Sequence, residues 1–549
     1  MMKYIALLMI AVLQYANSFS QPAAVINKVQ RPRLVVGIVV DQMRWDYLYK
    51  YYPLYSSNGG FKRLLNKGFS CENTLIPYTP TVTAAGHTCA YTGSVPAING
   101  IVGNDWYDNI ENKEVYCAED DSAATVGASG DAGKMSPRNN VVTTITDELR
   151  IATNYASKVI GISIKDRGAI FPAGHVANAA YWYDHDQGKF ITSTYYMNEL
   201  PRWVNAFNDR SLPDSFYKLN WNLSLPASTY KEYAGEDEQP YENKPFGNEQ
   251  AHFPYTLNGY VKKDYSKIAS TPYGNTLLEA MAEAVVLNEN LGKNSAADFL
   301  AVSFSSPDYI GHAFGPDSWE QMDDYIKLDA VFGKFFAFLD RQVGEGNYLV
   351  FLTADHAVAN SPGYAVKHRL PGGPFDAKPF TAGLKQLLLD KYKTDRLIKG
   401  KYNGQILLNS KELDSLNLDR NDVEKTIISY AESQPGIARA VSMRNLNTTT
   451  LTDVQKKMFS NSYFPQRSSD ILIVLKPGYV EGNGKGTSHG LWNPYDAHIP
   501  LLFYGWNVKA GKTNRETYMT DIAPTIAAML HIQMPSGCIG RVIPEVFEK

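Results

Sequence analysis

Residues 34–41 read Leu-Val-Val-Gly-Ile-Val-Val-Asp. The first seven are apolar and mostly β-branched, without alternating polar positions, which is typical of a strand buried on both faces of a parallel sheet. The run ends on Asp41, at the carboxyl end of the expected strand. Open parallel α/β sheets hold their ligands at that edge, so the segment predicts both a sheet and the edge where chemistry takes place.

The same pattern occurs twice more along the chain. Residues 298–304 form a mainly apolar run followed by Asp308, and residues 348–352 form another followed by Asp355. Helical periodicity lies between the expected strands, in segments 86–91, 275–287 and 319–339. Strands that alternate with helices predict an α/β fold with a mainly parallel central sheet and helices on both faces.

Two regions depart from this alternation. Residues from about 181 to 273 are rich in Tyr, Trp, Asn and Pro without sustained periodicity, and we predict a cap packed over the sheet. Residues from about 374 to 479 hold a helical pattern between two apolar strand-like runs, which predicts a small α+β insertion. We therefore expect one catalytic domain over residues 21–549 that carries both insertions.

The composition is that of an ordinary globular protein. Hydrophobic residues make up 44% of the 549 residues, and 53 Lys+Arg nearly balance 56 Asp+Glu. A balanced charge gives no electrostatic footprint for nucleic acid or for an anionic membrane, so any specificity for anions must be local. We expect a monomer that acts on small molecules. The cysteines permit three disulfide pairings, among which the sequence does not choose: Cys71, Cys89, Cys117 and Cys538.

The first twenty residues have the form of a secretory signal peptide. Lys3 precedes an apolar run over residues 5–13, and small polar residues follow near position 20. The run is shorter than the roughly 20 apolar residues that a membrane-spanning helix needs. We therefore predict cleavage near Gln21, export to the periplasm and no stable membrane insertion.

Six side chains of metal-binding type follow the expected strands or lie in a glycine-rich loop. They are Asp41, Asp308, His312, Asp355, His356 and His489. Asp308 and His312, four residues apart, share one face of a helical turn and can bind one cation together. Three carboxylates and three imidazoles suit two zinc ions, each of which takes about three or four such ligands. Any one of these residues alone is more often a cap or a satisfied polar group, so the prediction depends on the set.

The other seven histidines do not belong to a comparable set of candidate metal ligands in the sequence. We interpret them as structural or surface residues: His87, His175, His185, His252, His368, His498 and His531.

Thr83 is the predicted nucleophile. The segment Pro80-Thr-Val-Thr-Ala-Ala-Gly86 places its hydroxyl where a helix begins, and free N–H groups there favour a bound phosphate or an alkoxide. Without metal ligands nearby, the same threonine would be interpreted as a cap or turn residue. Asn104 adds an amide that can donate a hydrogen bond.

Lys165 and Arg167 are candidates for binding a phosphate dianion. They follow the apolar run 159–164 and, as alternate residues leaving a strand, point the same way. A cationic pair of this kind fits a phosphate group. The alternative, which the sequence alone favours, is a solvated surface pair bridged by Asp166.

The order of these residues resembles the alkaline phosphatase superfamily. Several longer segments resemble its periplasmic phosphate monoesterases of the PafA type: Val40-Asp-Gln-Met-Arg-Trp-Asp46, Pro80-Thr-Val-Thr-Ala84, Tyr91-Thr-Gly-Ser-Val-Pro-Ala-Ile-Asn-Gly100 and Gly103-Asn-Asp-Trp-Tyr-Asp108. The resemblance runs from Leu34 to the end of the chain. One departure is Ala357, where many relatives have Gly after the histidine.

The resemblance implies a role for each candidate residue. It implies one zinc on Asp308, His312 and His489, and a second zinc beside Thr83 on the remaining ligands, Asp41, Asp355 and His356. It also implies that Asn104, Lys165 and Arg167 bind the phosphoryl oxygens. The expected activity is hydrolysis of phosphate monoesters through a covalent phosphothreonine, with release of inorganic phosphate.

Three alternatives stay open at this point. A phosphodiesterase would use the same metals and threonine but should prefer an apolar pocket in place of the Lys165 and Arg167 cations. A sulfatase would need a Cys-x-Pro-x-Arg type motif, which the sequence lacks. The third alternative is an exported protein that keeps the fold and binds zinc or phosphate without catalysing any reaction.

Overall fold

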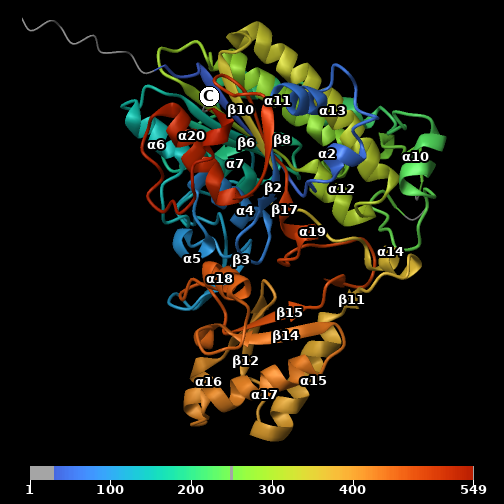
Figure 1. Ribbon diagram of the computed structural model, residues 1–549, viewed down its shortest axis with the longest axis vertical. Coiled ribbons are helices and arrows are strands. Elements are labelled where there is room, and N and C mark those ends of the chain that lie inside the picture. Colours follow the sequence, from blue (N-terminus) through green and yellow to red (C-terminus); the bar gives the residue numbers. More distant parts are fainter. Residues whose placement is uncertain (1–29, 248–251, 548–549) are drawn as a thin grey trace, which may run out of the picture. The chain divides into compact units, whose positions relative to one another are not determined.

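The computed structural model describes residues 30–247 and 252–547, so the predicted signal peptide, residues 1–20, lies outside the described residues. All that follows concerns the unit Pro32–Lys549. Its core is a large mixed sheet whose central strands are parallel. These strands are β10 (Tyr348–Thr353), β1 (Leu34–Val40), β9 (Asp298–Phe304), β6 (Val159–Ser163) and β7 (Ala179–Asp184), in that order (Figure 1).

The register of the central strands brings the three acidic segments to one edge. In β1, Val39 pairs with Ser303 of β9 on one side and with Thr353 of β10 on the other. The chain therefore leaves all three strands at the same level, just before Asp41, Asp308 and Asp355. Every residue of these three strands is buried, as their mainly apolar sequences predict.

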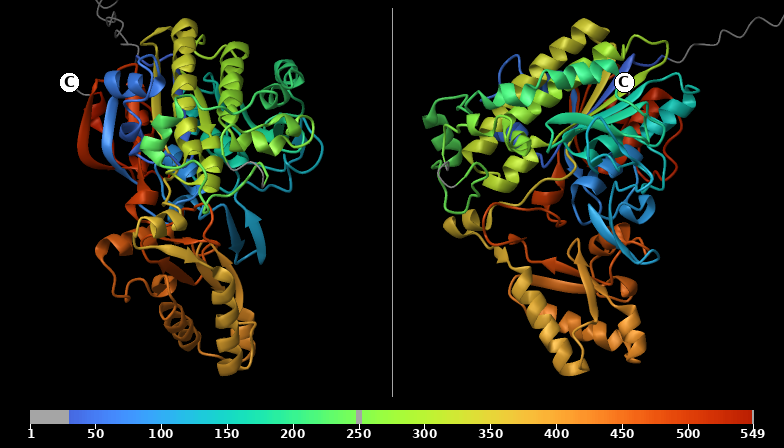
Figure 2. Two further views of the ribbon diagram at one scale, coloured as in Figure 1. Left: turned by 90° about the vertical axis from the view of Figure 1, so that its right-hand side faces the viewer. Right: turned by 180° about the vertical axis from the view of Figure 1, so that it is seen from behind.

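Helices cover the sheet on both sides, which confirms the predicted fold class. One group contains α3 (Gly60–Lys67), α11 (Pro272–Asn288) and α13 (Trp319–Leu339), and α13 contacts the other two. The other contains α4 (Thr83–Thr92), α6 (Ile145–Ala152), α7 (Asp166–Ala173) and α20 (Ile522–Leu530). Figures 1 and 2 show the two groups on opposite sides of the strands.

Toward both edges of the sheet, several strand pairs are antiparallel. Strand β18 (Leu501–Gly505) pairs with β10 and with β2 (Phe69–Leu75), while β8 (Lys189–Ser193) pairs with β7. Strands β7 and β8 overlap the start of the predicted cap at residue 181, so that region begins inside the sheet. The sequence of β7, Ala-Ala-Tyr-Trp-Tyr-Asp, contains aromatic residues that favour strands. The prediction of a cap relied on the overall composition of residues 181–273 and did not use this local signal.

The rest of the predicted cap is made of short helices. They are α8 (Arg202–Asp209), α9 (Leu212–Tyr217) and α10 (Ala227–Ala234), and they contact α11 and α13. The loop after α10 also contacts the edge where the acids lie. Tyr241 accepts a backbone hydrogen bond from Gly486, and Asn243 donates one to Ala313.

Residues 374–479 form a small α+β layer with its own core. An antiparallel sheet runs in the order β12 (Ile398–Tyr402), β13 (Gln405–Leu408), β15 (Ile471–Leu475), β14 (Ile437–Ser442). Helices α15 (Ala377–Tyr392) and α17 (Arg420–Glu432) pack on it (orange in Figure 1). A separate cluster of buried side chains fills the space between these helices and the sheet. Strand β11 (Gly373–Phe375) pairs in parallel with β16 (Tyr479–Glu481), so the two ends of the insertion are held together.

Across residues 30–247 and 252–547, no helix combines the length and apolar character that crossing a bilayer requires. The four cysteines are free thiols, and Cys71, Cys89 and Cys117 are buried.

Candidate metal centre and nucleophile

Three strand ends supply the acids of the site. Asp41 follows β1 directly, Asp355 follows β10, and Asp308 lies in the first turn of α12 (Ser306–Phe314), which follows β9. All three side chains are buried. Isolated buried carboxylates are costly, so this group needs cations or protons close by.

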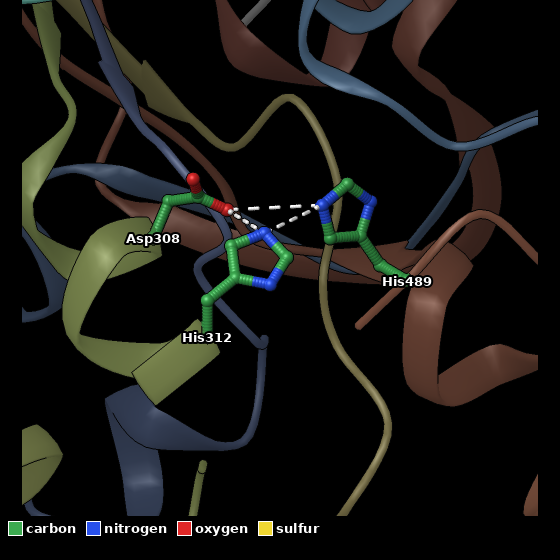
Figure 3. A group of neighbouring side chains, drawn as sticks. All are labelled: Asp308, His312 and His489. Atoms are coloured by element: carbon green, nitrogen blue, oxygen red, sulfur yellow. Dashed lines mark hydrogen bonds and ion pairs between the residues drawn. The ribbon is translucent and has the colours of Figure 1, made fainter. Parts of the chain in front are cut away.

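Asp308, His312 and His489 form the first cluster. The nearest ligand atoms of the three lie within 4.8 Å of one another. Nε2 of His312 is 3.2 Å from Asp308 Oδ1 and 3.2 Å from Nε2 of His489. Figure 3 shows the three side chains pointing toward one another, two from α12 and one from a loop. Asp308 and His312 therefore lie on one face of α12, and their joint binding of a cation stays a prediction.

The histidine tautomers suit metal binding. His312 Nδ1 lies 2.9 Å from the carbonyl oxygen of Thr487, and His489 Nδ1 lies 2.6 Å from that of Thr81. A carbonyl oxygen only accepts, so each Nδ1 carries the proton and each Nε2 presents a lone pair to the cluster. This arrangement, a ring N–H anchored on the backbone, is the usual one for metal-bound histidine.

The second cluster contains Asp41, Asp355 and His356. His356 Nε2 is 3.5 Å from both Asp41 Oδ1 and Asp355 Oδ2, and these three atoms are buried without a hydrogen-bond partner. Burial and the neighbouring Asp41 carboxylate raise the pKa of Asp355 well above its usual value, while burial lowers the pKa of His356 to about 4. Buried lone pairs that converge without donors fit a cation. Asp308 joins Asp41 and His356 within 4.8 Å, so the two clusters are contiguous.

Thr83 is the first residue of α4, where the sequence places the start of a helix, and α4 begins three residues before the periodic segment 86–91. It is buried, and the next backbone N–H, that of Ala84, donates to Asn104 Oδ1 at 3.0 Å. The Asn104 amide is therefore held beside the nucleophile candidate by its oxygen, which leaves its NH₂ group as the donor. Helix α4 directs free N–H groups toward this end.

Lys165 is not the solvated residue that the sequence alone favoured. Its Nζ lies 2.6 Å from Asp41 Oδ2 and 2.6 Å from Asp308 Oδ2, and its side chain is only 4% exposed. Burial lowers its pKa, but the two carboxylates outweigh burial and raise the pKa overall. Lys165 is thus a buried cation that bridges the two acid clusters.

Arg167 partly follows the alternative prediction. Its Nη1 is 3.7 Å from Asp166 Oδ1, and it donates to the Tyr116 hydroxyl at 3.0 Å. The side chain is 19% exposed, so the pair is half-buried rather than solvated. Helix α7 begins at Asp166, so Lys165 and Arg167 do not follow strand alternation as expected.

Gln42 is a site residue that the sequence reasoning did not identify. Its backbone N–H donates to Asp355 Oδ1 at 3.1 Å, and its Nε2 donates to Asp308 Oδ1 at 2.6 Å. It has a positive φ of 66°, uncommon for a residue other than glycine. Gly311 leaves room for it, because a Cβ at that position would lie 1.9 Å from Gln42 Oε1. A glutamine directly after a strand-end aspartate was the available signal.

His87, which we interpreted as a structural or surface residue, lies beneath the nucleophile candidate. Its Nδ1 is 2.8 Å from the Thr83 carbonyl oxygen and 3.4 Å from Asp355 Oδ2, and its Nε2 is 2.7 Å from Ser303 Oγ. Burial lowers its pKa to about 4, so the ring is neutral. Its spacing of four residues from Thr83, one helical turn, was the signal in the sequence.

Comparison with known proteins places these features in a family. Residues 35–496 match the family described as type I phosphodiesterase / nucleotide pyrophosphatase. The chain is 49% identical to alkaline phosphatase PhoV of Synechococcus elongatus, over 96% of this chain and 95% of that one. It is 46% identical to alkaline phosphatase PafA of Elizabethkingia meningoseptica, over 95% of each. A protein of Myroides odoratus named calcium-transporting ATPase is 47% identical over 97% of each chain.

The fold also matches that of a solved structure. The crystal structure of wild-type alkaline phosphatase PafA superimposes with a TM-score of 0.93 at 45% identity, covering 95% of this chain and all of that one.

Proposed function

Because the chain belongs to the type I phosphodiesterase / nucleotide pyrophosphatase family, we propose that it is a two-zinc alkaline phosphatase. In this proposal it hydrolyses phosphate monoesters through a phosphothreonine on Thr83. The observation that carries the proposal is the convergence of three acids and three imidazoles on one site next to α4, the helix that begins at Thr83. The alkaline phosphatase names of relatives with 46–49% identity support the same activity.

The donor set fits two zinc ions. Asp308, His312 and His489 would hold one, and Asp41, Asp355 and His356 would hold the other. Zinc ions bound there would supply Lewis-acid stabilisation of phosphoryl, nucleophile and leaving-group oxygens.

The residues of the chain itself position and stabilise the transferring group. Thr83 Oγ attacks phosphorus, forms a P–O bond and displaces the alcohol, and water later cleaves the phosphothreonine to give inorganic phosphate. The start of α4 and the Asn104 amide supply donors to the phosphoryl oxygens. Lys165 and Arg167 supply positive charge, which stabilises a loose phosphoryl-transfer transition state without a protein base.

The charge balance favours a monoester over a diester. The three carboxylates and Lys165 together carry a formal charge of −2, and two zinc ions would bring the site to +2. A monoester dianion neutralises that charge, whereas a diester monoanion leaves the site positive. The positive charge of Arg167 is not included in this sum. The family description keeps phosphodiester hydrolysis as the second candidate.

Steady-state rates on an aryl phosphate and on the methyl diester of the same phenol test the proposal. We expect kcat/KM to be larger for the monoester in zinc-loaded protein. A larger value for the diester would assign the site to the second candidate, and no turnover of either would leave only a binding protein.

We also propose that the enzyme is exported to the periplasm as a monomer, with residues 1–20 removed. N-terminal sequencing of periplasmic protein and its mass in solution test these two statements.

A further inference from the structure

The hairpin of β3 (Asp105–Asp108) and β4 (Lys113–Tyr116) opens at Asn104, one of the candidates for binding phosphoryl oxygens. Asn104 directly precedes β3, and Tyr116 is the last residue of β4. The two strands are paired up to Tyr116, and the N–H of Cys117 donates to the Asn104 carbonyl oxygen at 2.8 Å. The hairpin therefore holds the backbones of Asn104 and Tyr116 together.

The hydroxyl of Tyr116 joins this hairpin to Arg167, another candidate for phosphoryl binding. It accepts a hydrogen bond from Arg167 Nη1 at 3.0 Å and donates one to Asp166 Oδ1 at 2.5 Å. A guanidinium only donates and an ionised carboxylate only accepts, so the two bonds fix the orientation of the hydroxyl. Burial raises the pKa of Tyr116 well above its usual value, so the phenol keeps the proton that it donates.

Arg167 has donors beyond the one that Tyr116 binds. Its Nε is buried without a hydrogen-bond partner among the described residues, and an acceptor supplied by a ligand would remove the cost of that unpaired donor. The guanidinium is planar, so a bond to Nη1 also limits the directions of the other donors. Burial and the nearby Arg167 charge each act to lower the pKa of Lys165, although its two carboxylates outweigh them. The two cations therefore lie near one another, as joint binding of a dianion requires.

The ring of Tyr116 has a separate structural role. It packs against a buried cluster to which the hairpin, α4 and α7 contribute Trp106, Cys117, Ala84 and Ala169. The hairpin and both helices share this core whether or not the hydroxyl is present. Removal of the hydroxyl alone therefore tests its bond to Arg167 without disturbing the packing.

We propose that Tyr116 is a positioning residue for phosphoryl transfer, whose hydroxyl orients the Arg167 guanidinium toward the phosphoryl group that Asn104 also binds. The inference rests on the proposed function and deepens it, because it names the residue through which Arg167 is held. Tyr116 acts through Arg167 and does not touch the substrate. Without the hydroxyl, Arg167 keeps its charge but is free to turn toward Asp166, whose Oδ1 is already 3.7 Å from Nη1.

Tyr116→Phe removes the hydroxyl and keeps the ring. We expect kcat/KM for an aryl phosphate to fall about tenfold, the order of one hydrogen bond to a charged group. For the methyl diester of the same phenol we expect a change of no more than about twofold, because a single negative charge depends less on the Arg167 cation. Zinc content should stay at the wild-type level, since no metal-ligand candidate is altered.

Tyr348→Phe is the matched control. The Tyr348 hydroxyl also accepts from an arginine, Arg63 Nη2 at 3.2 Å, and donates to an aspartate, Asp340 Oδ1 at 2.7 Å. Tyr348 begins β10, whereas Asp355 follows the other end of that strand. We expect this variant to leave kcat/KM for both esters unchanged.

A double-mutant cycle separates positioning from a general structural effect. If the hydroxyl acts through Arg167, Tyr116→Phe should change kcat/KM for the monoester by less than about twofold once Arg167→Ala is present. The full tenfold loss in the Arg167→Ala background would overturn the inference, and so would wild-type monoester kinetics in Tyr116→Phe.

Binding of inorganic phosphate to the zinc-loaded protein, measured by titration calorimetry, tests the inference without turnover. We expect Tyr116→Phe to weaken phosphate binding about tenfold and Tyr348→Phe to match the wild type. Weaker phosphate binding in Tyr116→Phe alone, in a protein that hydrolyses neither ester, would support the positioning role and reject the proposed function. Equal phosphate affinity in Tyr116→Phe and in the wild type would overturn the positioning role even if the monoester is hydrolysed.

Discussion

Thr83 begins α4 beside the second acid cluster, and its role is the most direct prediction at the scale of a residue. Thr83→Ala should lower kcat by about 10³-fold or more, the order of loss that follows removal of a covalent nucleophile. It should abolish the burst of phosphoenzyme in rapid-quench experiments while zinc content stays at the wild-type level, because no metal-ligand candidate is altered. Full activity in this variant would move the nucleophile elsewhere.

Gln42 is predicted to position the ligands of both clusters. Gln42→Asn keeps a side chain that tolerates positive φ but shortens it, so the contact with Asp308 is lost. Loss of a hydrogen bond to a metal ligand typically lowers metal affinity about 10–100-fold, and zinc titration against a chelator of known affinity measures this.

Gln386→Asn is the control for that variant. Gln386 also donates from Nε2 to a carboxylate, at 2.9 Å to Asp390, but it lies on the exposed surface of α15. It should leave zinc affinity unchanged. Equal affinity in Gln42→Asn and in the wild type would mean that the contact does not position Asp308.

The metal-ligand candidates could be predicted from the sequence because each follows a strand whose apolar pattern is plain. The environment of Lys165 could not, because its two partners are 124 and 143 residues away in the chain. Gln42 and His87 were missed for the same reason. A glutamine or histidine gains its role only when strands β1, β9 and β10 and helix α4 meet.

At the scale of elements, the hairpin of β12 and β13 connects the insertion to the loop that carries Asn104. Asn403, in the turn of this hairpin, donates from Nδ2 to the Asp105 carbonyl oxygen at 2.8 Å. Gly103 permits this approach, since a Cβ there would lie 2.2 Å from the Asn403 side chain. Asn104 lies between these two contacts, so the hairpin is well placed to hold its amide in position.

Asn403→Gly should therefore lower kcat/KM for a phosphate monoester several-fold with zinc content unchanged, because a misplaced donor costs transition-state stabilisation. Glycine retains the positive φ of 51°, so the backbone of the turn is preserved. Asn417→Gly is the control, as Asn417 has the same φ on the exposed side of the insertion. Identical kinetics in both variants would exclude a positioning role for the hairpin.

Elements with one clear period were predictable and those with mixed signals were not. The sequence predicts α13 at its observed bounds, because apolar residues recur at helical spacing over all of residues 319–339. The sequence analysis instead assigned most of β7 and all of β8 to the expected cap. Their aromatic residues point into packed layers on both sides of the sheet, so no polar alternation marks them.

At the scale of the whole molecule, the buried acids of the candidate metal centre destabilise the folded state when no cation is bound. Of the three buried carboxylates, Asp41 and Asp308 contact the Lys165 ammonium group, and burial together with Asp41 raises the pKa of Asp355. Folding thus gathers negative charge that two zinc ions would neutralise. The three strands that precede these acids form the centre of the main sheet, so the charge acts on the core of the fold.

Removal of metal should therefore lower the melting temperature. A ligand present at a thousandfold above its Kd stabilises the folded state by about 4 kcal/mol, which corresponds to a fall of several degrees on chelation. Scanning calorimetry before and after dialysis against a chelator measures the fall, and added zinc should restore it. Thr83→Ala should show the same fall because its ligands are intact, whereas His312→Ala, with its first cluster already broken, should show a smaller one. A chelator that removes the metal without changing the melting temperature would show that the acids are tolerated without cations, and the charge argument for the site would fail.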